Sequence, residues 1–256
     1  MASRKQEKER LRLERIEAEK RASAEQRKRL VLGYILAGFL GLAVVVGIFF
    51  AISQGGGSSA GGGGEDDSEN VNTDFGFLPQ DLPVDERDGT EPPTVVNGDL
   101  TGAANVAGCD LQTNLPDEGN THFTDEDKVV EHKTNPPTSG DHYSNPREVG
   151  SGALADGAFL ETPNVNRTVH SLEHGRINIQ YSPDLPEEDQ LALKGVFDSD
   201  RPGVNLFPNA DMPYDVAVTA WTNLVGCETY EGVSTLDVVR AFRDAYRGQG
   251  PEPVTF

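Results

Sequence analysis

Cysteine, methionine, tryptophan and histidine are all scarce in this chain, which has two, two, one and five of them among 256 residues. The two cysteines form no Cys-x-x-Cys motif, which excludes the usual redox and zinc modules built on that motif. The chain also lacks a phosphate-binding loop, a dinucleotide fingerprint and a Gly-x-Ser-x-Gly elbow. The common nucleotide-binding and serine-hydrolase patterns are therefore excluded as explanations of function.

Basic residues are also in the minority, with 22 Lys and Arg against 42 Asp and Glu and a formal net charge of −20. Residues 1–29 hold 11 of the basic and 6 of the acidic side chains, so the rest of the chain carries a formal charge of −25. Such a field repels nucleic acid and attracts cations, and we expect no nucleic-acid partner.

One long hydrophobic run is present, Leu30–Ile52, with 23 residues and no charge. It is long enough to span about 30 Å of hydrocarbon, and no small-residue cleavage site clearly follows it. Residues 30–53 are therefore predicted to be an uncleaved signal anchor that makes a single pass through the cell membrane. Because residues 1–29 are basic, the positive-inside rule places the N-terminus in the cytoplasm and the C-terminal domain outside it.

The remaining organisation follows from composition. Residues 1–29 predict a charged cytoplasmic helix with mixed charges at i,i+4 spacing. Residues 54–105 hold two glycine-rich tracts and an acidic, proline-rich stretch, which is typical of a flexible linker. Residues 106–256 are long enough for one extracytoplasmic domain with an ordinary core.

Within that domain, the first half is rich in Asn, Pro, Gly and Asp and is expected to consist mainly of loops. The second half predicts three strands and two helices. These are strands at 176–181 (half-buried), 204–207 and 216–221, a helix at 186–197, and a helix capped by Ser234 and Asp237 that Gly248 ends. The predicted class is α+β, with a small mixed sheet and two packing helices, preceded by one transmembrane helix.

Cys109 and Cys227 both fall on the predicted outer side of the membrane. An even number of cysteines in an exported domain favours a disulfide, which here would close a loop of more than 100 residues. Two buried free thiols are the alternative.

All five histidines lie between His122 and His174, and two of them belong to the hexapeptide His-Ser-Leu-Glu-His-Gly that starts at His170. On a helix, His170, Glu173 and His174 share one face, whereas on a strand the two histidines share a face and Glu173 points to the other. In both cases the two imidazoles can converge on one metal ion. Gly175 limits any helix to a few turns that end here.

The same residues allow two other interpretations. His-x-x-Glu-His is the signature of one class of zinc proteases, in which the glutamate is the general base. That chemistry needs a sustained helix and a distant third protein ligand, and the sequence places no such helix here. A structural alternative is that one histidine caps the turn while the other bonds a backbone carbonyl. Enzymatic activity thus stays open at this point.

A second motif, Asn-Pro-Pro-Thr-Ser-Gly-Asp-His, ends at His142. Its two prolines fix the backbone, Thr138 and Ser139 can bond neighbouring amides, and Gly140 permits a positive φ. We expect a stiff loop that presents one imidazole, as a preformed ligand site requires. A structural turn with an exposed histidine is the alternative.

Together, the Pro-Pro-Thr-Ser-Gly-x-His and His-Ser-Leu-Glu-His-Gly motifs resemble a bacterial family of membrane-anchored extracytoplasmic domains with no assigned function. The resemblance covers roughly residues 118–256 and includes Ala220-Trp221, Cys227 and Pro251-Glu252. It implies a shared site rather than a known reaction. His132 falls where an aromatic residue is expected.

The resemblance implies a ligand set of His122, His142, His170 and His174. Three or four imidazoles suit zinc or copper(II), and Met212 could add a soft ligand for copper(I) unless it only fills a gap. The sequence therefore predicts binding of copper or zinc, in transport, storage or delivery. A metal-dependent hydrolase with Glu173 as base and a non-catalytic structural or interaction domain are the alternatives. The sequence identifies no protein partner.

Overall fold

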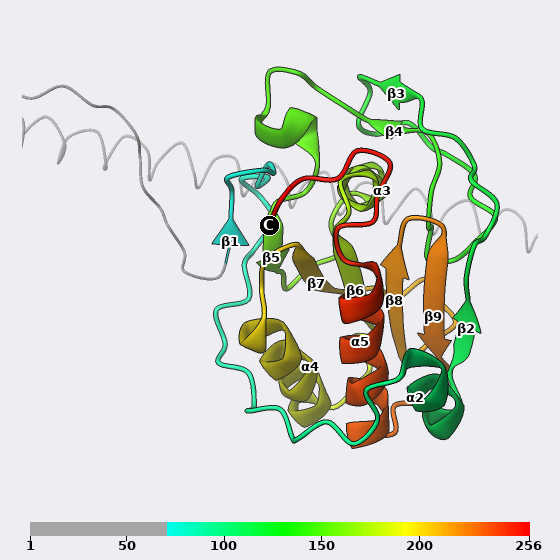
Figure 1. The fold of residues 1–256 in the computed structure, drawn as a ribbon. Helices are drawn as coiled ribbons and strands as arrows, with labels where there is room; N and C mark the ends of the chain where they lie inside the picture. Colours follow the sequence, from blue (N-terminus) through cyan, green and yellow to red (C-terminus); the bar gives the residue numbers. More distant parts are fainter. Residues whose placement is uncertain (1–70) are drawn as a thin grey trace, which may run out of the picture. The chain divides into compact units, whose positions relative to one another are not determined.

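A seven-stranded mixed β-sheet runs through residues 71–256, the part of the chain that this computed structural model describes (Figure 1). The strand order is β1-β5-β7-β6-β8-β9-β2, with β5, β7 and β6 mutually parallel and the other pairings antiparallel. Its strands are β1 (Val71–Asn72), β2 (Asp110–Gln112), β5 (Asp156–Ala158), β6 (Ile177–Tyr181), β7 (Val204–Pro208), β8 (Val216–Ala220) and β9 (Asn223–Cys227).

A separate parallel ladder joins β3 (His122–Phe123) to β4 (His142–Tyr143), and a short 3-10 helix, η1 (Val149–Gly152), follows it. Both lie in the loop-rich first half, as the composition predicts. The ladder is two residues long, and its register sets His122 directly opposite His142.

Three helices pack on one face of the large sheet and form its main hydrophobic core, namely α2 (Leu100–Ala107), α4 (Glu187–Ser199) and α5 (Val233–Tyr246). The alternation of β6 explains the arrangement, because Ile177, Ile179 and Tyr181 all point into this core. Asn178 and Gln180 therefore point to the opposite face.

On that opposite face lies α3 (Val165–Glu173), the helix that carries His170. It is held by polar contacts. The Ser171 hydroxyl donates to Oδ1 of Asn178, Nδ2 of Asn178 donates to the Thr168 carbonyl, and Nδ2 of Asn205 donates to the same Asn178 Oδ1. All five β6 residues are consequently buried, rather than half-buried as the sequence predicts.

The α+β class is confirmed, but the described residues contain four α-helices instead of two. The capping box predicted for the last helix is wrong. Gly232 is the N-cap residue of α5, and Asp237 instead accepts hydrogen bonds from the backbone amides of Val96 and Asn97. The Asp237 carboxylate thus makes a tertiary contact instead of the helix-capping contact that the local sequence pattern predicts.

Residues 71–105 differ from the flexible linker that the sequence predicts for 54–105. Val71 pairs with Gly157 in the sheet, Asp85 is buried, and α2 begins at residue 100. This segment is too polar to form a core, but the domain satisfies its backbone. It also crosses α4 so closely that a Cβ on Gly195 would lie 1.7 Å from the Thr90 carbonyl oxygen.

Residues 1–70 lie outside the described part of the chain, and with them the charged helix, the signal anchor and the glycine-rich tracts. Among residues 71–256, no helix is both long and apolar enough to cross a membrane.

The predicted disulfide is confirmed, since Cys109 and Cys227 are bonded across a sequence separation of 118 residues. Cys109 precedes the edge strand β2, and Cys227 ends β9, its neighbour in the sheet. The bond therefore joins the end of β9 to the residues between α2 and the edge strand β2.

A Cys109→Ser/Cys227→Ser variant is expected to lose about 4–5 kcal/mol of unfolding free energy, the chain-entropy value for a loop of this length. With a urea m value of roughly 2 kcal/mol/M, the midpoint should fall by about 2 M. Urea denaturation followed by circular dichroism measures this, and the wild type in dithiothreitol should match the variant. Equal midpoints for the oxidised wild type and the variant would contradict the expectation.

Candidate metal centre

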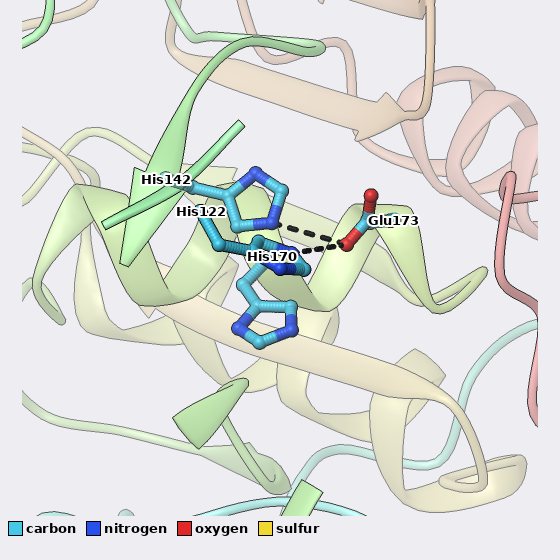
Figure 2. A group of neighbouring side chains, drawn as sticks. All are labelled: His122, His142, His170 and Glu173. Carbon is cyan, nitrogen blue, oxygen red and sulfur yellow. Dashed lines mark hydrogen bonds and ion pairs between the residues drawn. The ribbon is translucent and has the colours of Figure 1, made fainter. Parts of the chain in front are cut away.

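Four side chains from three segments converge beside the C-terminal end of α3: His122 from β3, His142 from β4, and His170 and Glu173 from α3 (Figure 2). Each offers a ligand atom within 4.8 Å of the others. The imidazole centroids of His122, His142 and His170 lie 4.7–5.2 Å apart. Except for His122, whose side chain is 40% exposed, the group is almost completely buried.

The proline-containing loop before His142 has the stiff structure that its sequence predicts. The hydroxyl of Ser139 accepts the backbone amide of Glu118, and both Thr138 and Ser139 are fully buried. Gly140 adopts φ +132° and donates its amide to the Gly119 carbonyl. This glycine turn directs the chain into β4 and the His142 side chain into the cluster.

The hexapeptide that starts at His170 is helical up to Glu173, and His174 forms the C-cap of α3. Asn164 caps the other end by accepting the amide of Asn166, and Gly175, at φ +84°, leads the chain out of the helix. The helical alternative for the motif therefore holds. His170 and His174 share a face, with 3.1 Å between their Nε2 atoms.

The environment of His142 fixes which of its ring nitrogens carries the proton. Nδ1 lies 2.8 Å from the carbonyl oxygen of Gly140, which can only accept, so Nδ1 must donate. In the neutral ring, Nε2 then carries a lone pair, and it lies 3.1 Å from Oε2 of Glu173. His174 is oriented in the same way, with Nδ1 2.8 Å from the carbonyl oxygen of Glu252.

Glu173 is the anionic member of the cluster, and Oε2 lies 3.0 Å from Nε2 of His122. Burial alone would raise the pKa of this carboxyl. The hydrogen bonds and charges of His142 and His122 outweigh burial and lower the pKa to about 2. Its other oxygen, Oε1, is buried and has no hydrogen-bond partner within residues 71–256.

His170 is disposed to stay neutral. Burial lowers its pKa, and the neighbouring His142, His174 and His122 lower it further, to about 3, against the opposing effect of Glu173. Nδ1 of His170 is buried and without a hydrogen-bond partner in the described part of the chain. The cluster thus holds two unsatisfied acceptor positions, a ring nitrogen and a carboxylate oxygen.

Trp221 packs with Val169 and Leu172 in a small buried cluster. It also meets the ring of His142 edge-on at a centroid distance of 6.3 Å, and its indole nitrogen donates to Asp117. Sequence reasoning missed this second role, because a single tryptophan carries no spacing pattern.

Met212 lies in the segment before β8, at the end of that strand away from Trp221. Met212 precedes β8, whereas Trp221, which contacts His142, follows it. Five residues of strand separate the two ends by roughly 17 Å. His132 is outside the group. Its Nδ1 lies 3.1 Å from the carbonyl oxygen of Ser139, and its ring packs against Gly140.

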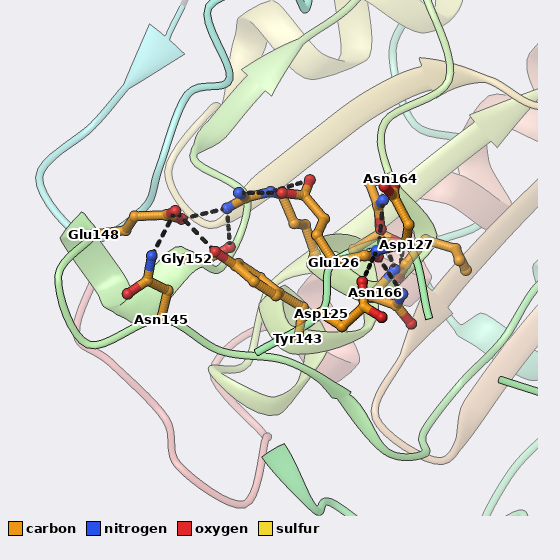
Figure 3. Close-up of polar contacts among 12 residues, drawn as sticks. Asp125, Glu126, Asp127, Tyr143, Asn145, Glu148, Gly152, Asn164 and Asn166 are labelled. Atoms are coloured by element: carbon orange, nitrogen blue, oxygen red, sulfur yellow. Dashed lines mark hydrogen bonds and ion pairs between the residues drawn. The ribbon is translucent and has the colours of Figure 1, made fainter. Parts of the chain in front are cut away.

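A buried arginine, which sequence reasoning missed, connects the segments that carry the histidines. Arg167 of α3 forms a bidentate ion pair with Glu126, with N···O distances of 2.6 and 2.7 Å. Its third nitrogen donates to Glu148 at 2.7 Å and to the Gly152 carbonyl (Figure 3). Glu126 belongs to the loop after β3, and Glu148 to the loop after β4.

Aromatic contacts complete this arrangement. The guanidinium carbon of Arg167 lies 4.5 Å from the ring centroid of Tyr143 and 4.6 Å from that of Phe77. Tyr143 follows His142 directly, and its hydroxyl donates to Glu148 (Figure 3). Arg167 therefore holds both histidine-bearing loops over the helix that carries His170.

The Glu148 contact should be visible in the pH dependence of stability. Burial alone would raise the pKa of this carboxyl, but hydrogen bonds from Arg167, Tyr143 and Asn145, with the charge of Arg167, lower it below its ordinary value of 4.5. Because the pKa is lower in the folded chain, the contact stabilises the fold above about pH 4.5 and loses its contribution as the pH falls further.

We therefore expect the unfolding free energy to fall more steeply below about pH 4.5 in the wild type than in Glu148→Gln. Urea titrations at a series of pH values measure both slopes. The exposed Glu231→Gln is the matched control and should behave as the wild type. Identical slopes for wild type and Glu148→Gln would refute the assignment.

Comparisons with known proteins agree with this organisation. A family model described as "Protein of unknown function (DUF3105)" matches residues 122–255, a range that begins at His122 and includes every residue of the cluster. No curated protein and no solved structure matched the chain. Since the match covers more than half of its 256 residues, the chain belongs to the DUF3105 family.

Proposed function

We propose that this domain binds a divalent transition metal ion, Zn²⁺ or Cu²⁺, through His122, His142, His170 and Glu173. The donor set of three imidazoles and one carboxylate suits zinc and copper(II). Magnesium and calcium prefer oxygen ligands and fit it poorly. The formal charge of −25 beyond residue 29 attracts cations towards the domain.

The observation that carries this proposal is the direction of the His142 ring. Its Nδ1 proton is donated to the Gly140 carbonyl, so Nε2 presents a lone pair to Oε2 of Glu173 at 3.1 Å. Two electron pairs at this distance repel each other unless positive charge lies between them. Either a proton on Nε2 or a bound metal ion supplies that charge, and we propose the metal ion. Histidines that bind metals commonly donate their other ring nitrogen to a backbone carbonyl, as His142 does.

The distances between ligand atoms support the same proposal. Tetrahedral zinc with Zn–N bonds of 2.0–2.1 Å sets neighbouring ligand atoms about 3.3 Å apart. Oε2 of Glu173 lies 3.0 and 3.1 Å from Nε2 of His122 and His142. A shift of a few tenths of an ångström would therefore accommodate the ion. His170 adds a further ring nitrogen within 4.8 Å of the other ligand atoms.

The position of Met212 favours the divalent ions over copper(I). Copper(I) prefers soft sulfur ligands. Met212 is at the far end of β8, and both cysteines are joined in the disulfide. The proposed site consequently contains nitrogen and oxygen donors without sulfur. We propose that the domain holds the ion outside the cytoplasm, for storage or delivery.

A hydrolase with Glu173 as general base receives less support from this geometry. A general base works best when its pKa lies near the operating pH. The contacts of Glu173 with His122 and His142 lower its pKa to about 2, and they place its oxygen where a metal ligand would be.

The purified full-length chain, carrying no histidine tag, is expected to retain one equivalent of Zn²⁺ or Cu²⁺ after exposure to both ions and dialysis. Mass spectrometry of the metals measures the amount and identifies the ion. His142→Ala should weaken binding by about 100-fold or more, because it removes a ligand. The matched control is His132→Ala, which removes the histidine outside the cluster and should retain the metal. Metal retained equally by wild type and His142→Ala would refute the site.

Bound metal should also stabilise the fold. At a free ion concentration of about 100 times Kd, the unfolding free energy should rise by about 2.7 kcal/mol. Thermal unfolding with and without a chelator measures this change, and His142→Ala should show none. If the chelator leaves the wild-type midpoint unchanged and no metal is retained, the histidines are structural, with a protonated His142 beside Glu173.

A further inference from the structure

We propose that a second, solvent-facing cation site adjoins the buried one and shares Glu173 with it. Its other members are His174 and Glu252, and one ligand atom of each of the three residues lies within 4.8 Å of the others. This inference rests on the proposed function and extends it from one bound ion to two.

Backbone pairing between the C-terminal tail and the end of α3 brings Glu252 to this position. The amide of Glu252 donates to the Glu173 carbonyl at 3.0 Å, and the amide of Val254 donates to the His174 carbonyl at 3.2 Å. Gly250 permits this approach, since a Cβ there would lie 2.1 Å from the carbonyl oxygen of Glu173. The pairing involves main-chain atoms, so the Glu252 carboxylate remains available.

The two oxygens of Glu173 have different surroundings. Oε2 contacts His122 and His142, whereas Oε1 is buried and has no hydrogen-bond partner among the described residues. An uncompensated carboxylate oxygen in a buried site is costly. A carboxylate can bind one ion through each oxygen, and proteins use pairs of ions about 3.5–4 Å apart in this way. A cation bound by Oε1 would satisfy it.

His174 and Glu252 supply complementary donors. Nδ1 of His174 donates to the Glu252 carbonyl, so Nε2 of the neutral ring carries a lone pair. This Nε2 lies 3.1 Å from Nε2 of His170, and an ion bound by His174 would replace that contact. Within residues 71–256 the Glu252 carboxylate makes no hydrogen bond or ion pair, and the residue is exposed. One imidazole and two carboxylates are a donor set that zinc accepts. Because Glu252 faces solvent, the second ion should bind more weakly and exchange faster than the buried one.

The experiment is a titration of the metal-free full-length chain with Zn²⁺, followed by calorimetry and by competition with a chromophoric chelator. The wild type is expected to bind two equivalents, the second with an affinity at least about tenfold lower. In Glu252→Gln the second equivalent should weaken by a further tenfold or more, while the first changes less than about threefold. Glu228→Gln, an exposed control after β9, should match the wild type.

The outcomes separate this inference from the proposed function. One equivalent in the wild type, lost in His142→Ala and unaffected by Glu252→Gln, would overturn the second site and leave the first standing. Two equivalents that are both insensitive to Glu252→Gln would likewise overturn it. Absence of zinc binding in the wild type would overturn the second site, and the first would then stand only if the chain retained Cu²⁺.

Discussion

The ion pairs of Arg167 are the contacts on which the arrangement of the histidine cluster depends. A guanidinium that is 3% exposed is tolerated only when it is fully paired, and here the two paired carboxylates come from different loops. Because Glu126 follows His122 and Glu148 follows His142 in the chain, neutralising one buried charge also anchors both histidine-bearing segments. The main hydrophobic core lies on the opposite face of the sheet, so it does not anchor these two segments.

The charge balance of the cluster follows from this placement. Four imidazoles and one carboxylate lie together, with His142, His170 and Glu173 shielded from water, and the carboxylate keeps its charge because the rings surround it. Two backbone carbonyls, those of Gly140 and Glu252, orient the rings of His142 and His174. Oriented imidazoles next to an ionised carboxylate are an arrangement that a divalent cation can bind.

The parts of the fold that local patterns encode were predictable. The alternation at 176–181 and the apolar spacing at 187–199 and 233–246 correspond to β6, α4 and α5. Strand β9 carries no comparable pattern because Gly226 interrupts it, and α2 follows a stretch whose composition is that of a linker. That stretch is ordered because the rest of the domain forms hydrogen bonds with its backbone groups. Its own sequence does not indicate that these partners exist.

The histidine cluster was also predictable in part. The two motifs contain His142, His170 and His174, and the family resemblance adds His122. The glycine turn before His142 follows from its residues. Arg167, Glu126 and Glu148 were not identifiable, because isolated charged residues in a charged sequence carry no spacing signal. Met212 was singled out for the opposite reason. Its rarity made it conspicuous, whereas its position depends on strand directions that composition does not give.

The two-residue ladder between β3 and β4 has one further consequence. His122 and His142 face each other only in the native register, and a slip of one residue would turn one of them to the opposite side. The candidate ligands are also spread from His122 to Glu252, so half of the chain must be in place before they meet. A chain that is misfolded or cleaved within this range would lose an ion bound at the proposed site. Occupancy of the site would thus report the integrity of the domain.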